Sequence, residues 1–259
     1  MLKRTFLHLP KVGHLTERKL WAEGLESWED ALDRSAPPSG FSARRWSDAC
    51  RLLEESRRSL ERREHRFFAQ CLPPGEHWRA VPEFSARRAF LDIETTGMGP
   101  GARVTVIGLY DGTRVRTYVA GDNLACFCED LSEFPLIVTF NGASFDLPFL
   151  CRRFAEMPRD FLHVDLRWLL RRLGQTGGLK QIERRLGLAR ADDLADLSGE
   201  DAVRLWREYA AGDERALELL VRYNAADVEN LEVLLDWAFP RLWEQTRAGL
   251  EGEARERDG

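Results

Sequence analysis

The sequence lacks any long apolar run. No stretch approaches the roughly 18 consecutive apolar residues that a membrane-spanning helix needs. The first residues, Met1–Phe6, also lack the apolar segment of a secretory signal. We therefore expect a cytoplasmic protein that has no membrane partner.

Cysteine is scarce and irregularly placed. The five cysteines form no Cys-x-x-Cys pair, and no downstream pair of histidines completes a zinc-ligand set. An odd number of scattered cysteines is also atypical of a disulfide framework. We expect reduced thiols that are mostly buried.

Four acidic residues on three separate segments are the most informative feature of the chain. Asp92 and Glu94 interrupt the apolar run 89–94, Asp146 follows a Phe-Asn-Gly triplet, and Asp227 comes four residues after Tyr223 in a helical stretch. Residues at i and i+2 of a strand share one face and lie roughly 6 to 7 Å apart. Two anions on one face of a buried strand repel each other unless a cation balances them.

The residue types indicate which cation this is. Carboxylate oxygens are hard ligands that suit Mg²⁺ or Mn²⁺. Two such ions about 3.5 to 4 Å apart can hold both the attacking and the leaving oxygen of a phosphodiester. The pattern therefore predicts two Mg²⁺ or Mn²⁺ ions, held by Asp92, Glu94, Asp146 and Asp227, and hydrolysis of phosphodiester bonds.

Each acid also has a structural explanation that needs no metal. Asp92 and Glu94 could pair with nearby arginines, and Asp146 could cap a helix N-terminus. Tyr223 could be a buried aromatic whose hydroxyl is satisfied. The metal interpretation is favoured because the acids occur together in one ordered set.

The ordered segments Leu-Asp-Ile-Glu-Thr-Thr-Gly, Phe-Asn-Gly-Ala-Ser-Phe-Asp and Tyr-Asn-Ala-Ala-Asp carry a family resemblance. They resemble the DEDDy branch of the ribonuclease H-like, DnaQ-like 3′–5′ exonucleases, and within it the YprB-like domains of bacteria. The resemblance covers roughly residues 86–240. It implies an α/β fold, in which helices flank a ribonuclease H-like mixed β-sheet.

The resemblance also implies roles for individual residues. It assigns catalysis to Asp92, Glu94, Asp146, Tyr223 and Asp227. Because a phenol is a poor base at neutral pH, Tyr223 is expected to orient the attacking water. Candidate substrate-binding residues are Thr95, Thr96, Asn141 and Lys180.

Two functions remain open at this level. The first is a 3′–5′ exonuclease that acts on the ends of single-stranded DNA or RNA, as the resemblance implies. The second is a catalytically silent ribonuclease H-like adaptor that binds nucleic acid. The complete set of acids and Tyr223 favours the enzyme. His163 and Asp165 could be a further acid/base pair, but a carboxylate at a helix start is the favoured interpretation of Asp165.

Charge is distributed unevenly along the chain. Residues 1–88 carry 17 lysines and arginines against 13 acids, whereas residues 89–259 carry 21 against 30. An acidic region attracts phosphate weakly, so the basic N-terminal part and the bound metals would have to supply the attraction. The arginines of that part could equally form the solvated face of a helix.

The pattern of apolar residues divides the chain into three regions. We expect residues 1–85 to form a helical accessory region, 86–240 the exonuclease domain and 241–259 a polar tail that is disordered from Glu251. Within the accessory region, a seven-residue apolar repeat over 42–71 predicts one long amphipathic helix. Its apolar stripe could bind a protein partner, although packing against the exonuclease domain is more economical.

Beyond residue 85 the sequence predicts alternating strands and helices. Strands are expected over 89–94, 102–110, 113–119 and 136–140, with a short edge strand over 161–164. Helices are expected over 124–134, 145–154, 179–186 and 201–209. A final helix should run from Arg215 to about Trp237 and stop before Pro240.

Overall fold

The computed structural model describes the backbone of residues 1–99 and 101–255 and the side chains of residues 1–99 and 101–248. The chain divides into two compact units. Unit 1 comprises Met1–Ala86, Asp160–His163 and the chain from Pro240, and unit 2 comprises Arg87–Arg159 and Val164–Phe239. No helix among the described residues is both long and apolar enough to cross a membrane.

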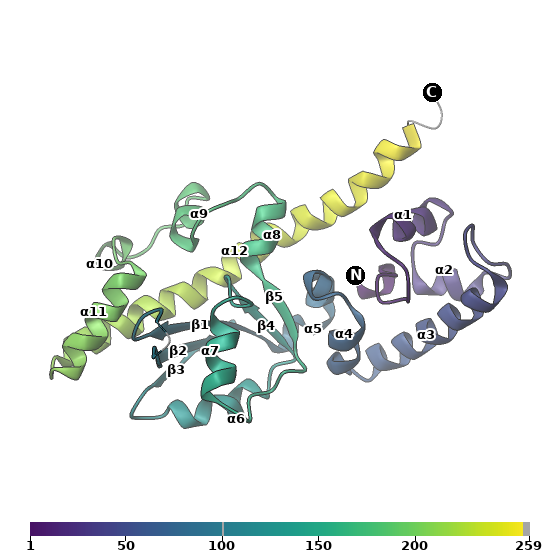
Figure 1. Ribbon diagram of the computed structural model, residues 1–259. Coiled ribbons are helices and arrows are strands. Elements are labelled where there is room, and N and C mark those ends of the chain that lie inside the picture. The colour runs from purple at the N-terminus through teal and green to yellow at the C-terminus, as the bar shows by residue number, and fades with distance from the viewer. Residues whose placement is uncertain (100, 256–259) are drawn as a thin grey trace. The chain divides into compact units, whose positions relative to one another are not determined.

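Unit 1 consists mainly of short helices (Figure 1). They are η1 (Leu2–Arg4), α1 (His14–Ala22), α2 (Trp28–Asp33), α3 (Ala43–Glu61), α4 (His65–Cys71), η2 (Pro74–Ala80) and α5 (Val81–Phe84), and η3 (Ser85–Arg87) leads into unit 2. The prediction of one helix over 42–71 was wrong, because the chain turns between α3 and α4. Arg63 adopts a left-handed backbone conformation with φ 57°.

The turn between α3 and α4 is a Schellman motif. The Glu64 N–H donates to the Ser59 carbonyl at 2.8 Å, and the Arg63 N–H donates to the Leu60 carbonyl at 3.0 Å. These two bonds satisfy carbonyls that the end of α3 leaves unpaired. Arginine stands where such motifs usually have glycine, so the sequence gives no signal that a helix ends here.

The apolar stripe of α3 and α4 packs inside unit 1. Leu53 and Phe68 are fully buried, and the Phe68 ring stacks on Trp28 of α2 with centroids 6.2 Å apart. A buried ion cluster lies in the same unit: Arg79 pairs with Glu17 at 3.0 Å and with Glu76 at 2.6 Å. The stripe is therefore used to build the core of this unit.

Unit 2 is built around a five-stranded sheet with the order β3-β2-β1-β4-β5 (Figure 1). The β2 strand runs antiparallel to both β1 and β3, and β4 runs parallel to β1. This sheet confirms the predicted ribonuclease H-like α/β fold. The bounds are β1 Arg88–Thr95, β2 Val104–Tyr110, β3 Val115–Val119, β4 Leu136–Thr139 and β5 Leu162–Asp165.

The predicted hairpin around Asp111-Gly112 is confirmed. The Asp111 carboxylate accepts hydrogen bonds from the backbone N–H groups of Thr113 and Arg114, at 2.9 and 3.0 Å. Gly112 has φ 89°, a backbone conformation that residues with a Cβ atom rarely adopt. Local turn chemistry therefore fixes the pairing of β2 with β3.

Helices connect and flank the strands of unit 2. They are η4 (Leu124–Cys126), α6 (Phe127–Leu131), α7 (Asp146–Arg153), α8 (Leu166–Arg172), α9 (Leu179–Arg185), α10 (Asp192–Ala195), α11 (Gly199–Ala210) and α12 (Glu214–Arg255). The α7 helix lies in front of the strands in Figure 1. The short helix α10 was not predicted, and α8 was expected only as a helix start at Asp165, because neither is long enough to show a clear apolar period.

The last helix is longer than its sequence predicted. α12 continues through Pro240 to Arg255, so the predictions of an end near Trp237 and of disorder from Glu251 were wrong for the described part, while residues 256–259 lie outside it. Proline removes one backbone hydrogen bond from the helix. Beyond it, Leu242 is fully buried, and the burial of an apolar side chain favours the folded helix at this point.

The five cysteine thiols are free. Only Cys128 is buried, Cys126 is exposed, and the other three are intermediate. The prediction that these thiols are mostly buried was therefore wrong.

Gly108 sets how closely α12 approaches the sheet. It lies opposite Asp92 in the antiparallel register of β1 and β2. A Cβ atom at this position would lie 2.3 Å from Oδ1 of Asn224 and 3.2 Å from Cγ1 of Val228, both on α12. No side chain larger than hydrogen fits between the strand and this turn of α12.

We predict that Gly108→Ala lowers the free energy of unfolding by about 1–3 kcal/mol, the usual cost of forcing extra volume into a packed interior. Gly199→Ala is the matched control, because its Cβ would meet nothing within 4 Å. Chemical denaturation measures both. Combining Gly108→Ala with Asn224→Ala should cost less than the sum of the single changes, since the second removes the clashing side chain. Strictly additive costs would contradict this packing.

Candidate metal centre

Three carboxylates converge where β1 faces α12. Asp92 and Glu94 lie on β1, Asp227 lies on α12, and one oxygen from each lies within 4.8 Å of the other two. Glu94 and Asp227 are buried, and Asp92 is half-buried. This acid cluster unites residues that are more than 130 positions apart in the chain, as the sequence predicted.

Asp146 lies beside the acid cluster without being one of its three members. It is the first residue of α7, it is buried, and its Oδ1 accepts a hydrogen bond from the Ile93 N–H at 3.1 Å. Ile93 stands between Asp92 and Glu94 on β1. The hydrogen bond therefore ties the start of α7 to the strand that carries both acids.

The electrostatics of the cluster are unfavourable without a cation. Burial raises the pKa values of Asp92 and Glu94 well above their ordinary range, and the charges of Asp227 and Asp146 raise them further. Burial also raises the pKa of Asp146 to about 7 and that of Asp227 to about 6. A divalent cation would relieve both the desolvation and the repulsion, so the donor set fits Mg²⁺ or Mn²⁺.

One face of α12 serves the cluster. Tyr223 and Asn224 lie four and three residues before Asp227, and Asn230 lies three residues after it, so all three contribute to the face that carries Asp227. The Asn224 amide donates to Oδ2 of Asp92 at 2.9 Å, opposite Gly108. Sequence reasoning missed Asn224, although its position three residues before Asp227 was a usable signal.

Arg190 supplies a counter-charge that the sequence did not reveal. Its guanidinium contacts Oδ1 of Asp227 and binds both carboxylate oxygens of Glu183 of α9, at 2.6 and 2.7 Å. The Asn230 amide donates to Glu183 at 3.0 Å. Arg190 opposes the rise in the pKa of Asp227, but burial has the larger effect. The arginine pairing considered for Asp92 and Glu94 thus occurs at Asp227 instead.

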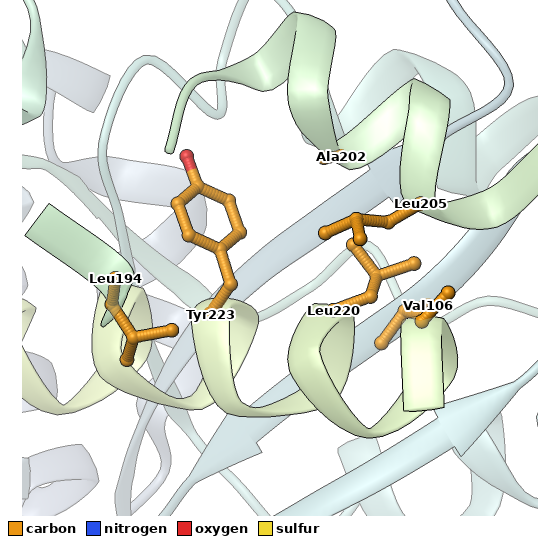
Figure 2. Close-up of a cluster of buried hydrophobic side chains, with 7 residues drawn as sticks. Val106, Leu194, Ala202, Leu205, Leu220 and Tyr223 are labelled. Atoms are coloured by element: carbon orange, nitrogen blue, oxygen red, sulfur yellow. The ribbon is translucent and has the colours of Figure 1, made fainter. Parts of the chain in front are cut away.

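Tyr223 lies against the acid cluster with its hydroxyl directed away from α12. Figure 2 shows the ring standing on α12, with Leu194 on one side and Leu205 and Leu220 on the other. Burial raises the pKa of the phenol well above its ordinary value, and the charges of Asp227 and Glu94 raise it further. The hydroxyl therefore stays protonated at neutral pH.

Lys180 is beside Tyr223 but faces away from solvent. Its ammonium lies 4.4 Å from the centroid of the Tyr223 ring, and within the described chain it has no hydrogen-bond partner. Burial lowers the pKa of this ammonium, while Asp227 opposes that shift. Lys180 thus places positive charge next to the acid cluster.

The candidate substrate-binding residues of the first two motifs hold loops. The Thr95 hydroxyl donates to the Gly97 carbonyl at 2.8 Å, and the Thr96 hydroxyl accepts from the Arg103 N–H at 3.0 Å. Asn141 has φ 65°, and its side-chain oxygen accepts from Arg167 at 2.7 Å.

Asp165 is a helix-start carboxylate, as the favoured interpretation held. It accepts a hydrogen bond from the Arg167 N–H and so caps α8. It also accepts from the backbone N–H groups of Asn141 and Ala143, at 2.8 and 3.1 Å. Asp165 thereby fixes the loop that leads to Asp146. The backbone N–H of His163 donates to Nδ1 of His77 within unit 1.

The acid cluster opens into a cavity of about 920 Å³. Of the residues singled out from the sequence, six line it: Asp92, Glu94, Thr95, Asn141, Tyr223 and Asp227. Thr96, Asp146 and Lys180 do not line the cavity. Ser198 and four residues of α11, Gly199, Glu200, Val203 and Arg207, also line it. The cavity is large enough for a nucleotide-sized group next to the carboxylates.

The sequence also matches the model of a known superfamily. Residues 89–239 match the family model described as RNase_H superfamily, which is more than half of the chain. The chain therefore belongs to the RNase H superfamily. No curated protein matches the sequence.

Among solved structures, the chain is similar to the family B DNA polymerase from the hyperthermophilic archaeon Pyrobaculum calidifontis. The TM-score is 0.49 and the sequence identity is 18%. The match covers 59% of this chain and 24% of the polymerase, so the chain spans about a quarter of that protein.

We predict that metal-free protein loses stability as the pH rises from 5 to 8. Asp227 and Asp146 bind protons in the folded state up to about pH 6 and 7, and the pKa values of Asp92 and Glu94 are raised as well. In the unfolded state these carboxyls release their protons near pH 4. Folding therefore takes up protons in this window, and stability falls as they dissociate.

Thermal unfolding in EDTA measures this effect. Asp92→Asn with Asp227→Asn is the reference, because it removes two of the titrating carboxyls. The wild type should lose more stability than this variant between pH 5 and 8. Mg²⁺ or Mn²⁺ should raise the melting temperature of the wild type more at pH 8 than at pH 5, since the ions compete with protons. Equal pH dependence of the two proteins would contradict the electrostatic argument.

Proposed function

We propose that this protein is a metal-dependent nuclease that hydrolyses the phosphodiester bonds of nucleic acid. The observation that carries the proposal is the acid cluster: three carboxylates within 4.8 Å, two of them buried, on the floor of an open cavity. Burying carboxylates with raised pKa values lowers the stability of the folded protein. Such groups are common at catalytic sites, and bound cations would offset the loss of stability.

Asp92, Glu94 and Asp227 would hold the ions directly, and Asp146 would take part from beside them. When bound, the ions would lower the pKa of a water molecule and offset the charge that develops on the phosphate. Asn224 holds the Asp92 carboxylate in place through its 2.9 Å hydrogen bond. The Ile93–Asp146 bond fixes the fourth acid relative to the other three.

Tyr223 would orient the attacking water. Only the deprotonated phenolate could act as a base, and burial together with three nearby carboxylates keeps the phenol protonated. Among the described residues no hydrogen-bond partner of its hydroxyl is found, which leaves the hydroxyl available to a water in the cavity. The phenol can therefore position a water molecule, while the proton must leave by another route.

The finer assignment rests on the resemblance of the three motifs. Asp92, Glu94, Asp146, Tyr223 and Asp227 fit the DEDDy set, and the wording of the segments favours the YprB-like branch. From that resemblance we propose two Mg²⁺ or Mn²⁺ ions and 3′–5′ removal of nucleotides from single-stranded ends. A degradation assay on 5′-labelled single- and double-stranded DNA and RNA tests polarity, strandedness and sugar preference together.

We predict that Asp92→Asn and Asp227→Asn each abolish hydrolysis while the protein stays folded. Either change removes an ion ligand but relieves repulsion among buried carboxylates. Product formation with Mn²⁺, together with thermal unfolding in EDTA, provides the measurement. Asp193→Asn is the matched control, since this exposed acid pairs with Arg222 away from the cavity. Full activity of Asp92→Asn, or robust wild-type activity in EDTA, would exclude the metal mechanism.

We predict that Tyr223→Phe lowers the rate by about 100-fold or less, within the range of one positioned group. The ring and its packing remain, so metal-dependent stabilisation should barely change. Rates of both proteins across pH at saturating Mn²⁺ separate the possible roles. A loss as large as that of Asp227→Asn would mean that the phenol is an obligatory base. An unaltered rate would mean that Tyr223 is only a core aromatic.

A further inference from the structure

Unit 2 contains a second hollow, separate from the cavity at the acid cluster. It has a volume of about 620 Å³ and is lined by the start of β2, the segment that follows β3 and the end of α7. Arg103, Arg152 and Arg153 line it, together with a single acid, Asp122. We refer to this hollow as the arginine groove.

The three arginines are not neutralised. In the described part of the chain none of them forms an ion pair. Other arginines of unit 2, by contrast, pair with acidic side chains. Aromatic rings hold two of them in place: the Arg152 guanidinium lies 4.4 Å from the centroid of Phe149, and that of Arg153 lies 4.9 Å from the centroid of Phe154.

This concentration of free positive charge stands out against its surroundings. Residues 89–259 carry 30 acids against 21 lysines and arginines, so the region as a whole repels phosphate. Three exposed guanidinium groups line one hollow against a single carboxylate, so the charged side chains of this hollow are mainly positive. Arginine suits such a role, because its planar group binds phosphate oxygens through two hydrogen bonds at once.

The groove is joined to the acid cluster through α7. This helix begins at Asp146 beside the cluster and ends with Arg152 and Arg153. Six to seven residues of helix span roughly 10 Å, a short distance for a nucleic-acid strand to cover. In Figure 1 the helix can be followed from one end to the other in front of the sheet.

Two further contacts join the groove to the cavity. The Arg103 N–H donates to the Thr96 hydroxyl, and the Thr96 N–H donates to the Arg103 carbonyl at 2.9 Å. Thr96 directly follows the Asp-Ile-Glu-Thr segment of β1. The ring of Phe145, which lines the cavity, lies 4.9 Å from the ring of Phe149, which lines the groove.

We propose that the arginine groove binds the sugar-phosphate backbone of a single-stranded nucleic acid whose end lies at the acid cluster. The inference rests on the proposed nuclease function and extends it, because it says where the rest of the substrate lies. Without its ions an acidic cavity attracts a polyanion weakly, so a positive surface nearby would supply binding energy for the rest of the strand. The half-buried ring of Phe145, between the two hollows, offers a face on which a base can stack.

The test compares two triple variants of the full chain. The groove variant is Arg103→Gln/Arg152→Gln/Arg153→Gln. The matched control is Arg114→Gln/Arg159→Gln/Arg215→Gln, which removes the same charge from exposed arginines of unit 2 that line neither hollow. Fluorescence anisotropy in EDTA measures binding of fluorescein-labelled oligodeoxythymidylate and oligouridylate of about 12 nucleotides, within the usual site size.

We expect the groove variant to bind at least tenfold more weakly than the control at low salt. The plot of log affinity against log salt should become less steep, with the magnitude of its slope smaller by about 2, as three lost phosphate contacts on a single strand imply. Arg103→Lys/Arg152→Lys/Arg153→Lys should recover most of the affinity, which separates loss of charge from loss of structure. Equal affinity of the groove variant and the control would overturn the proposal.

Activity distinguishes this proposal from the nuclease proposal. The groove variant should degrade the oligonucleotides more slowly at low substrate concentration, but should cleave bis(p-nitrophenyl) phosphate, which is too small to reach the groove, at the wild-type rate. A wild type that binds oligonucleotides through the groove and hydrolyses neither substrate would refute the nuclease function alone. Loss of small-diester cleavage in the groove variant would refute the separation of the two hollows.

Discussion

Repulsion among buried carboxylates is the constraint on which unit 2 depends. Asp92 and Glu94 are next-but-one neighbours on a central strand, and Asp227 faces them from α12. Left alone, such a group would drive the strand and the helix apart. The surrounding contacts hold them together: Asn224 bonds to Asp92, and Arg190 pairs with Asp227. Gly108 allows α12 to come close enough for the first of these bonds.

The same constraint explains why the supporting residues are spread along the chain. The Glu183 carboxylate holds Arg190, and the Asn230 amide in turn holds Glu183. Asp165 orders the loop before Asp146 by accepting from two backbone N–H groups. Glu183 acts on Asp227 through Arg190, and Asn230 acts on it through Glu183 and Arg190. A cluster of like charges thus requires a layer of polar partners whose positions are as well defined as those of the acids.

Much of this architecture follows from the sequence, because its causes are local. The strands of unit 2 show apolar runs with turn residues between them, and the acids of the cluster stand in short ordered motifs. Other features depend on contacts that no local pattern encodes. The α3 helix ends in a Schellman motif with arginine at the glycine position, and α12 continues through Pro240 to the buried Leu242. Arg190 lies 37 positions from the aspartate that it neutralises.

The α12 helix makes four side chains of the candidate centre depend on one another when the chain changes length. Tyr223, Asn224, Asp227 and Asn230 occupy a single face of one continuous helix, within little more than two turns. Each residue of a helix turns the chain by about 100°. Inserting or deleting one residue before this segment can be absorbed by the preceding loop, but the same event inside it would rotate part of the set away from the sheet. These four side chains are therefore retained or lost together when the chain changes length, whereas each can still be exchanged singly by substitution.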